Sequence, residues 1–82
     1  MKKEEIFEII INHAREVIPE LNGHNFQIND VLKDLGANSI DRSEIVTMTL
    51  ESLSLHIPLI ETVGAGNIGE LAGLLYEKSQ AK

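Results

Sequence analysis

Apolar residues recur at helical spacing near the start of the chain and predict a first helix over residues 3–18. On a helical wheel the apolar face is formed by Ile6, Phe7, Ile10, Ala14 and Val17. Charged and amide side chains occupy the opposite face. Pro19 is expected to end this helix, because proline pushes the residue before it out of the α region.

Residues 19–38 carry no helical period and predict a long first loop. Apolar side chains are spread through it at Phe26, Ile28, Val31, Leu32 and Leu35. A loop of this length in a small domain is usually either held in place or functional. We therefore expect these side chains to insert into the helical core. Asn29 or Asp30 is predicted to cap a short turn near residues 30–34.

The second helix is predicted over residues 39–54, with a less regular pattern than the first. Its apolar side is formed by Ile45, Val46, Leu50 and Leu53, with Thr49 among them. Ile40 and Met48 fall on the polar flanks. Either neighbouring segments bury these two side chains, or they remain free to contact a partner.

The last part of the chain predicts one or two helical turns within residues 59–66 and a final helix over 68–79. Gly64 and Gly66 interrupt the first of these, and Asn67 is a good N-cap for the second. The apolar stripe of the final helix is formed by Ile68, Leu71, Ala72 and Leu75.

Together these segments predict an all-α protein without a β-sheet. The fold is a small antiparallel helical bundle with three main helices, a short helix before the last one, and a long first loop. Eighty-two residues are enough for one domain only, so residues 1–82 are expected to form a single domain.

Composition narrows the classes of function. The net charge of −6 argues against nucleic acid and anionic membrane surfaces as partners and favours basic protein surfaces. No cysteine is present, so a thiol must come from an added group. The N-terminus does not look like a signal peptide, and no apolar run reaches membrane-spanning length. We expect a cytoplasmic monomer.

The sequence offers little support for catalysis. His13, His24 and His56 lack metal-ligand spacing and are expected to be solvated, so we predict no metal site. Ser39 follows a turn at Gly36 and lies at the start of the second helix, where its hydroxyl can cap backbone N–H groups. The dipole at this end favours a phosphate. Ser39 lacks the strand–turn–helix elbow of a hydrolase, so no catalytic residue is predicted.

The residues around Ser39 resemble those of acyl carrier proteins. The string Leu35-Gly36-Ala37-Asn38-Ser39-Ile40-Asp41 is similar to their leucine-glycine turn followed by Asp-Ser-Leu. Three further landmarks follow in order, and they are Glu44-Ile45-Val46, Ile57-Pro58 and Asn67-Ile68-Gly69-Glu70-Leu71. Four landmarks at matching spacing make the resemblance specific, and it spans nearly the whole chain.

Departures from the common pattern indicate a subgroup. Asn38 replaces the usual Asp, Ser43 stands where an apolar residue is frequent, and beyond Glu44 the second helix keeps only Glu51 as an acid. The string Asn-Ser-Ile-Asp-Arg-Ser-Glu-Ile is similar to stand-alone donor carriers of polyketide β-branching cassettes. These carriers work with an enzyme resembling hydroxymethylglutaryl-CoA (HMG-CoA) synthase.

The resemblance implies a covalent cofactor and a set of partners. Ser39 would receive 4′-phosphopantetheine from coenzyme A through a phosphopantetheinyl transferase, and the thiol of this arm would carry an acyl thioester. The implied cargo is malonyl, supplied by an acyltransferase. A decarboxylating ketosynthase-like enzyme would convert it to acetyl, which then passes to the HMG-CoA synthase-like enzyme.

Residues beside Ser39 are predicted to contact these partners: Asn38, Ile40, Asp41, Arg42, Ser43, Glu44, Thr47 and Glu51. Ile40, Ser43 and Thr47 share a helix face with Ser39, and Arg42 lies to its other side. Three alternatives remain open at this point: a fatty-acid-type carrier, an aminoacyl or peptidyl carrier, and a helical adaptor that is never modified.

Overall fold

The computed structural model describes residues 1–80, and within them the fold is all-helical, as predicted. Its α-helices are α1 (Lys3–Val17), α2 (Ser39–Ser52) and α3 (Ile68–Gln80). Its 3-10 helices are η1 (Pro19–Gly23), η2 (Leu32–Leu35) and η3 (Leu59–Thr62). None of residues 1–80 forms a strand.

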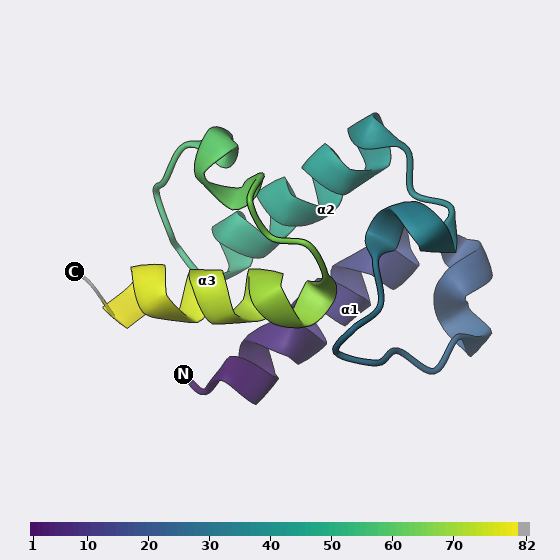
Figure 1. The fold of residues 1–82 in the computed structure, drawn as a ribbon, viewed down its shortest axis with the longest axis horizontal. Coiled ribbons are helices and arrows are strands. Elements are labelled where there is room, and N and C mark those ends of the chain that lie inside the picture. Colours follow the sequence, from purple (N-terminus) through teal and green to yellow (C-terminus); the bar gives the residue numbers. More distant parts are fainter. Residues whose placement is uncertain (81–82) are drawn as a thin grey trace.

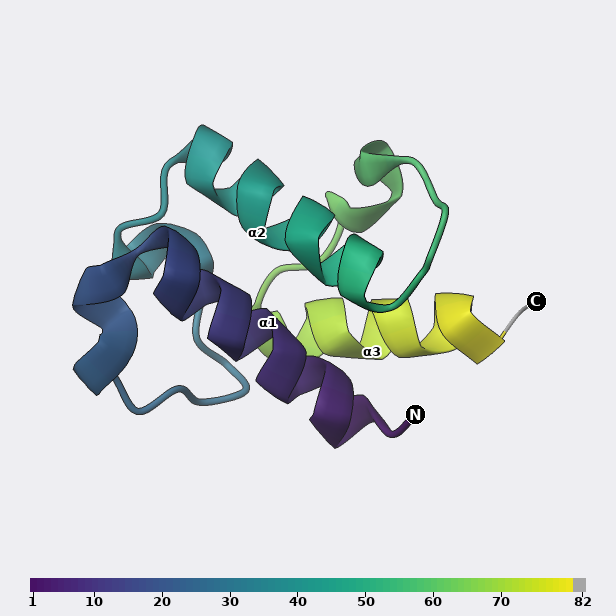
Figure 2. The ribbon, with the colours of Figure 1, turned by 180° about the vertical axis from the view of Figure 1, so that it is seen from behind.

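Helix α1 is the centre of the bundle, because it packs against both α2 and α3 (Figure 1). Helices α2 and α3 both run in the sense opposite to α1, as seen from either side (Figures 1 and 2). The start of α2 therefore lies at the far end of the bundle from the N-terminus. No helix within residues 1–80 is long and apolar enough to cross a membrane.

The apolar face predicted for the first helix forms much of the core. Ile6, Ile10 and Ala14 are fully buried, and Phe7 and Val17 pack against them half-buried. Ile11 is also buried at 4% exposure, although the predicted stripe did not include it. The helix ends one residue earlier than predicted, because Ile18 before the proline leaves the α region, with a φ of −126° and a ψ of 88°.

The first loop is held by fewer side chains than predicted. Phe26 and Leu32 are buried, but Ile28 is 69% exposed, so its predicted insertion into the core is wrong. The predicted cap of the turn is also wrong. Val31 occupies the N-cap of η2 and provides no side-chain hydrogen bond, while Asp30 is engaged elsewhere. Helix η1 was not predicted, since a five-residue turn shows no period.

Backbone hydrogen bonds replace the missing side-chain anchor at Ile28. The carbonyl oxygen of Ile28 accepts from the Gly69 N–H at 2.7 Å, and that of Asp30 accepts from the Ile68 N–H at 2.9 Å. These two N–H groups belong to the first turn of α3, where no partner exists inside the helix. Carbonyl groups of the first loop thus accept the two N–H groups at the start of α3. The close approach of the two backbones leaves no space for a side chain on residue 69.

We expect Gly69→Ala to destabilise the fold, because its Cβ would lie 2.7 Å from the Ile28 carbonyl oxygen. Relieving that overlap requires the loop backbone to move, which costs about 1–3 kcal/mol. Gly73→Ala is the matched control in the same helix. Its Cβ would meet nothing closer than 3.9 Å, so the better helix propensity of alanine should stabilise it. Urea unfolding of both variants tests this, and equal midpoints would contradict it.

Two of the three histidines are hydrogen-bonded rather than freely solvated, so that prediction is wrong for His13 and His24. His24 Nε2 lies 2.9 Å from the Asp30 carboxylate, and the His24 ring packs edge-on against Phe26 at 4.7 Å. Asp30 also accepts from the Gln27 N–H at 2.8 Å. The Gln27 bond and then His24 lower the pKa of Asp30 below its ordinary value. Both bonds favour the ionised form.

The lowered pKa of Asp30 predicts that the protein loses stability as the pH falls into the acid range. A carboxyl group with a depressed folded-state pKa stabilises the protein above its unfolded pKa of 3.8, and this contribution is lost as pH falls through the lower folded value. The stability difference between wild type and Asp30→Asn should therefore be constant near neutral pH and shrink below about pH 4. Urea unfolding at several pH values measures it. A difference that does not change with pH would contradict the assignment.

The second half of the chain follows the predicted pattern closely. Asn67 caps α3, since its Oδ1 accepts from the Glu70 N–H at 2.7 Å. The predicted apolar stripe of α3 is buried throughout. Helix α2 ends at Ser52, two residues before the predicted boundary, and Ser54 has a φ of +52°. An ion pair of 2.8 Å between Glu61 and Lys78 joins η3 to α3.

Candidate functional site

A tight turn at Gly36 connects η2 to α2. Gly36 ends η2 with a φ of +102°, a left-handed conformation that residues with a Cβ rarely adopt. Its N–H donates to the carbonyls of Leu32 and Lys33. Ala37 follows with 2% exposure and donates to the Leu32 carbonyl at 3.1 Å. This buried alanine fixes where α2 begins.

Asn38, and not Ser39, is the N-cap of α2. Its Oδ1 accepts from the Asp41 N–H at 2.8 Å, and the Asp41 carboxylate accepts from the Asn38 N–H at 3.3 Å. This reciprocal pair is a capping box. The predicted capping role of Ser39 is therefore wrong by one position. Asp41 is likewise engaged in the capping box rather than left free.

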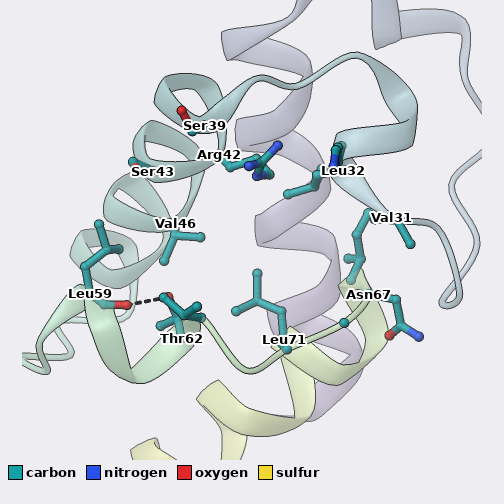
Figure 3. Close-up of a pocket in the computed structure, with 15 residues that line it drawn as sticks. Val31, Leu32, Ser39, Arg42, Ser43, Val46, Leu59, Thr62, Asn67 and Leu71 are labelled. Atoms are coloured by element: carbon teal, nitrogen blue, oxygen red, sulfur yellow. Dashed lines mark hydrogen bonds between the residues drawn. The ribbon is translucent and has the colours of Figure 1, made fainter.

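Ser39 is consequently an exposed side chain in the first turn of α2 without a structural task. No hydrogen bond formed within residues 1–80 engages its hydroxyl. The hydroxyl points away from the interior of the adjoining cleft (Figure 3). It lies where unpaired backbone N–H groups and the helix dipole favour an anion. An enzyme can reach and modify such a hydroxyl without disturbing the fold.

A cleft of about 410 Å³ adjoins Ser39, between η2, α2, η3 and the start of α3. Leu32, Val46 and Leu71 form apolar walls that face one another across it (Figure 3). Thr62 adds a hydroxyl, but this group is already engaged, because it donates to the Leu59 carbonyl at 2.7 Å. The cleft therefore offers a mostly apolar surface with a polar rim beside Ser39.

Arg42 lies in this cleft, in a role that the sequence did not indicate. Its Nη1 donates to the Ala37 carbonyl at 2.8 Å, and its side chain points across the cleft towards Leu32 (Figure 3). Lys33 lines the same cleft from η2. The helical wheel placed Arg42 on the surface beside Ser39, but only the position of the Ala37 carbonyl shows where its guanidinium goes.

Most of the other predicted recognition residues form a stripe on α2, which we call the exposed face of α2: Ile40, Ser43, Glu44, Thr47 and Glu51. Ile40 is 74% exposed, so no neighbouring segment within residues 1–80 buries it. Met48, the other flank residue, is half-buried. The structure brings this stripe next to Ser39, and its member Ser43 also lines the cleft that contains Arg42.

A second serine lies in an arrangement that resembles a hydrolase. His13 Nε2 is 2.7 Å from Ser52 Oγ, and His13 Nδ1 is 2.9 Å from the Glu16 carboxylate. However, Ser52 is the last residue of α2, where the dipole is negative and carbonyls rather than N–H groups are unpaired. Such an end cannot stabilise an oxyanion. The contact between His13 and Ser52 joins α1 to α2, and sequence periodicity could not have revealed it. The His13–Glu16 pair lies within α1 at i, i+3 spacing, which the helical wheel does indicate.

Comparison with known proteins identifies the class to which this fold and exposed serine belong. No protein-family model matches the chain. It is, however, 57% identical over 81 residues to the polyketide biosynthesis acyl-carrier-protein AcpK of Bacillus subtilis (strain 168), covering 99% of both chains. The chain belongs to the acyl carrier proteins of polyketide biosynthesis. As a member it is a carrier and not an enzyme, and its cofactor is a covalently attached 4′-phosphopantetheine.

A solved structure has the same fold. The chain superposes with a TM-score of 0.89 on a chain of the crystal structure of the curacin biosynthetic pathway HMG synthase in complex with acetyl donor-ACP. The two share 49% sequence identity, and the match covers 92% of this chain and 96% of that one. The all-α bundle and the family resemblance predicted from sequence are both confirmed.

Proposed function

We propose that Ser39 carries the 4′-phosphopantetheine and that the protein is the acetyl donor to an HMG-CoA synthase-like enzyme of polyketide β-branching. The likeness to a structure that contains an acetyl donor carrier supports the donor role. The observation that carries the attachment site is the Ser39 hydroxyl, which is exposed and free of hydrogen bonds within residues 1–80 at the start of α2.

The other serines are less suited to the attachment. Ser52 is engaged by His13, and Ser79 donates to the Tyr76 carbonyl at 2.7 Å. Ser54 follows the C-terminal end of α2, where the dipole opposes a phosphodiester. Ser43 is exposed but lies one turn inside the helix, beyond the unpaired N–H groups of the first turn. Ser39 alone combines exposure with a favourable helix end.

The residues around Ser39 hold the phosphopantetheine arm in position and take no part in a chemical reaction. The arm supplies the thiol that the cysteine-free chain lacks. The capping box of Asn38 and Asp41 holds the first turn of α2, so that its N–H groups stay directed at the phosphodiester. The cleft gives the arm and its cargo an apolar surface to rest on. Tethering then raises the local concentration of cargo at a docked active site.

The exposed face of α2 is the surface that we propose for partner docking. Ile40 supplies apolar area, and Glu44 and Glu51 suit basic groups on a partner. Asn38 is exposed beside Ser39 and lies within reach of the same partner. A modest interface of this kind allows the carrier to dock and release repeatedly.

Four partners follow from this function: a phosphopantetheinyl transferase, an acyltransferase, a decarboxylating ketosynthase-like enzyme and the HMG-CoA synthase-like enzyme. We propose that the protein meets them as a single-domain monomer in the cytoplasm, where coenzyme A is available for its modification. The negative net charge of −6 suits basic docking surfaces on all four.

An acetyl transfer assay tests the donor role. Wild type loaded with acetyl-phosphopantetheine should transfer acetyl to an HMG-CoA synthase-like enzyme faster than to a fatty-acid ketosynthase. Ser43→Val, on the exposed face of α2, should slow that transfer while its melting temperature and its modification stay near wild type. Equal rates with both enzymes would favour a fatty-acid-type carrier. Acceptance of aminoacyl cargo only would favour a peptidyl carrier.

A further inference from the structure

The cleft beside Ser39 has a charge that contrasts with the rest of the chain. The protein has 13 acidic and 7 basic residues, yet the cleft is lined by Lys33 and Arg42 and by no Asp or Glu. Among residues 1–80, neither cation forms an ion pair with a carboxylate. A cleft built only for a neutral acyl chain needs no cation, because half-burying a charge costs free energy.

The guanidinium of Arg42 is positioned so that it can bind a planar anion. Its bond to the Ala37 carbonyl fixes one nitrogen of the guanidinium, and the side chain points across the cleft towards Leu32 (Figure 3). A guanidinium has five N–H donors in a fixed plane, so the remaining donors can bind a carboxylate in a two-pronged manner. Ala37 is itself buried at 2% exposure, so the backbone that carries the anchoring carbonyl is packed into the core.

Two anions can approach this cleft, and their positions differ. The phosphodiester of the arm is bonded to the Ser39 hydroxyl, which points away from the cleft interior (Figure 3). A carboxylate at the far end of the arm reaches the cleft only when the arm folds back over its apolar walls. The Arg42 guanidinium points across the cleft towards Leu32, so it lies over the apolar walls and not beside the Ser39 hydroxyl (Figure 3).

We infer that Arg42, assisted by Lys33, binds the free carboxylate of a dicarboxylate-derived cargo of the malonyl class in the cleft beside Ser39. This inference rests on the proposed attachment at Ser39. It predicts that the cleft binds the cargo of the malonyl-loaded protein more strongly than the cargo of the acetyl-loaded protein. Loss of the cargo carboxylate as CO₂, with a proton taking its place, leaves a neutral acetyl group that the cations no longer hold. The acetyl form is then freer to leave the cleft.

The test compares the full-length protein in three loading states: unacylated, acetyl and malonyl. A transferase that accepts acyl-coenzyme A donors attaches each arm to wild type, Arg42→Gln and the control Lys3→Gln, which removes a distant exposed cation on α1. Malonyl-loaded wild type should melt at a higher temperature than acetyl-loaded wild type. Arg42→Gln should lose that difference, and Lys3→Gln should keep it.

A ¹³C-labelled malonyl carboxylate gives a readout that is independent of stability. Its pKa in the loaded wild type should lie about one unit below that of a free malonyl thioester, because a neighbouring cation favours the ionised form. The value should return to that of the free thioester in Arg42→Gln. Arg42→Lys keeps the charge and should retain part of the shift, even if the bond to Ala37 is lost.

Three results would overturn the inference. One is identical melting of malonyl- and acetyl-loaded wild type, and another is a carboxylate pKa equal to that of the free thioester. The third is a ³¹P signal that Arg42→Gln shifts equally in all three loading states, which would show that Arg42 binds the phosphodiester instead. Failure of all variants to accept an arm at residue 39 would instead contradict the proposed attachment. The two failures are therefore distinguishable.

Discussion

Replacing Ser39 with alanine should abolish attachment of phosphopantetheine and, with it, all acyl transfer from the protein. The loss should be complete because the remaining serines are either hydrogen-bonded or placed away from the start of α2. The fold should be unaffected. Asn38 and Asp41 form the cap, so removing the Ser39 hydroxyl should change the free energy of unfolding by less than about 0.5 kcal/mol.

Asn38→Ala is the matched control, because it removes the cap and keeps the attachment hydroxyl. It should lower stability by about 0.5–2 kcal/mol and still be modified to completion at residue 39. The extent of modification is compared, and not its rate, because Asn38 lies within reach of the transferase. Loading from labelled acetyl-coenzyme A and urea unfolding, measured on both variants, separate the two roles. A Ser39→Ala protein that still accepts the label would contradict the assignment.

Replacing Phe26 with alanine should cause a large loss of stability, about 3–5 kcal/mol. Phe26 is 8% exposed and is the main side-chain anchor of the first loop. Its ring packs against His24 and lies under the Arg15 guanidinium at 5.2 Å, so the substitution removes a cation–π contact as well. The free energy of unfolding of a native domain is only about 5–15 kcal/mol, so the variant should be near the limit of folding.

Ile28→Ala provides the control for this prediction in the same loop. Ile28 is 69% exposed and contributes through its carbonyl group, which alanine retains. Its substitution should therefore change stability by less than about 0.5 kcal/mol. Circular dichroism during urea unfolding compares the two. A Phe26→Ala variant as stable as wild type would show that the first loop is not anchored by this ring.

Sequence periodicity predicted the three long helices well, because α1 and α3 bury regular apolar stripes and α2 buries a less regular one around Ile45, Val46 and Leu50. It was less informative wherever contacts decide the structure. Ile28 looked like a core residue, yet its backbone carbonyl is the part that the fold uses, as an acceptor for Gly69. His13 and His24 looked solvated, since their partners Ser52 and Asp30 come from distant or irregular segments.

The site was predictable in its position but not in its detail. A turn at Gly36 followed by polar residues indicated a helix start at residue 39, which is correct, but it suggested Ser39 rather than Asn38 as the cap. Which of the two forms the cap depends on the register set by buried Ala37. The family pattern singled out Ser39. The pattern could not show that Arg42 turns into the cleft, because that direction depends on the Ala37 carbonyl.

The central claim is that this chain is a carrier with one arm at Ser39, and the mass of the protein tests it most directly. Wild type incubated with coenzyme A, Mg²⁺ and a phosphopantetheinyl transferase should gain the mass of one 4′-phosphopantetheine. Fragmentation should place that mass on the peptide that contains Ser39. An unchanged mass, or the same gain in Ser39→Ala, would contradict the claim.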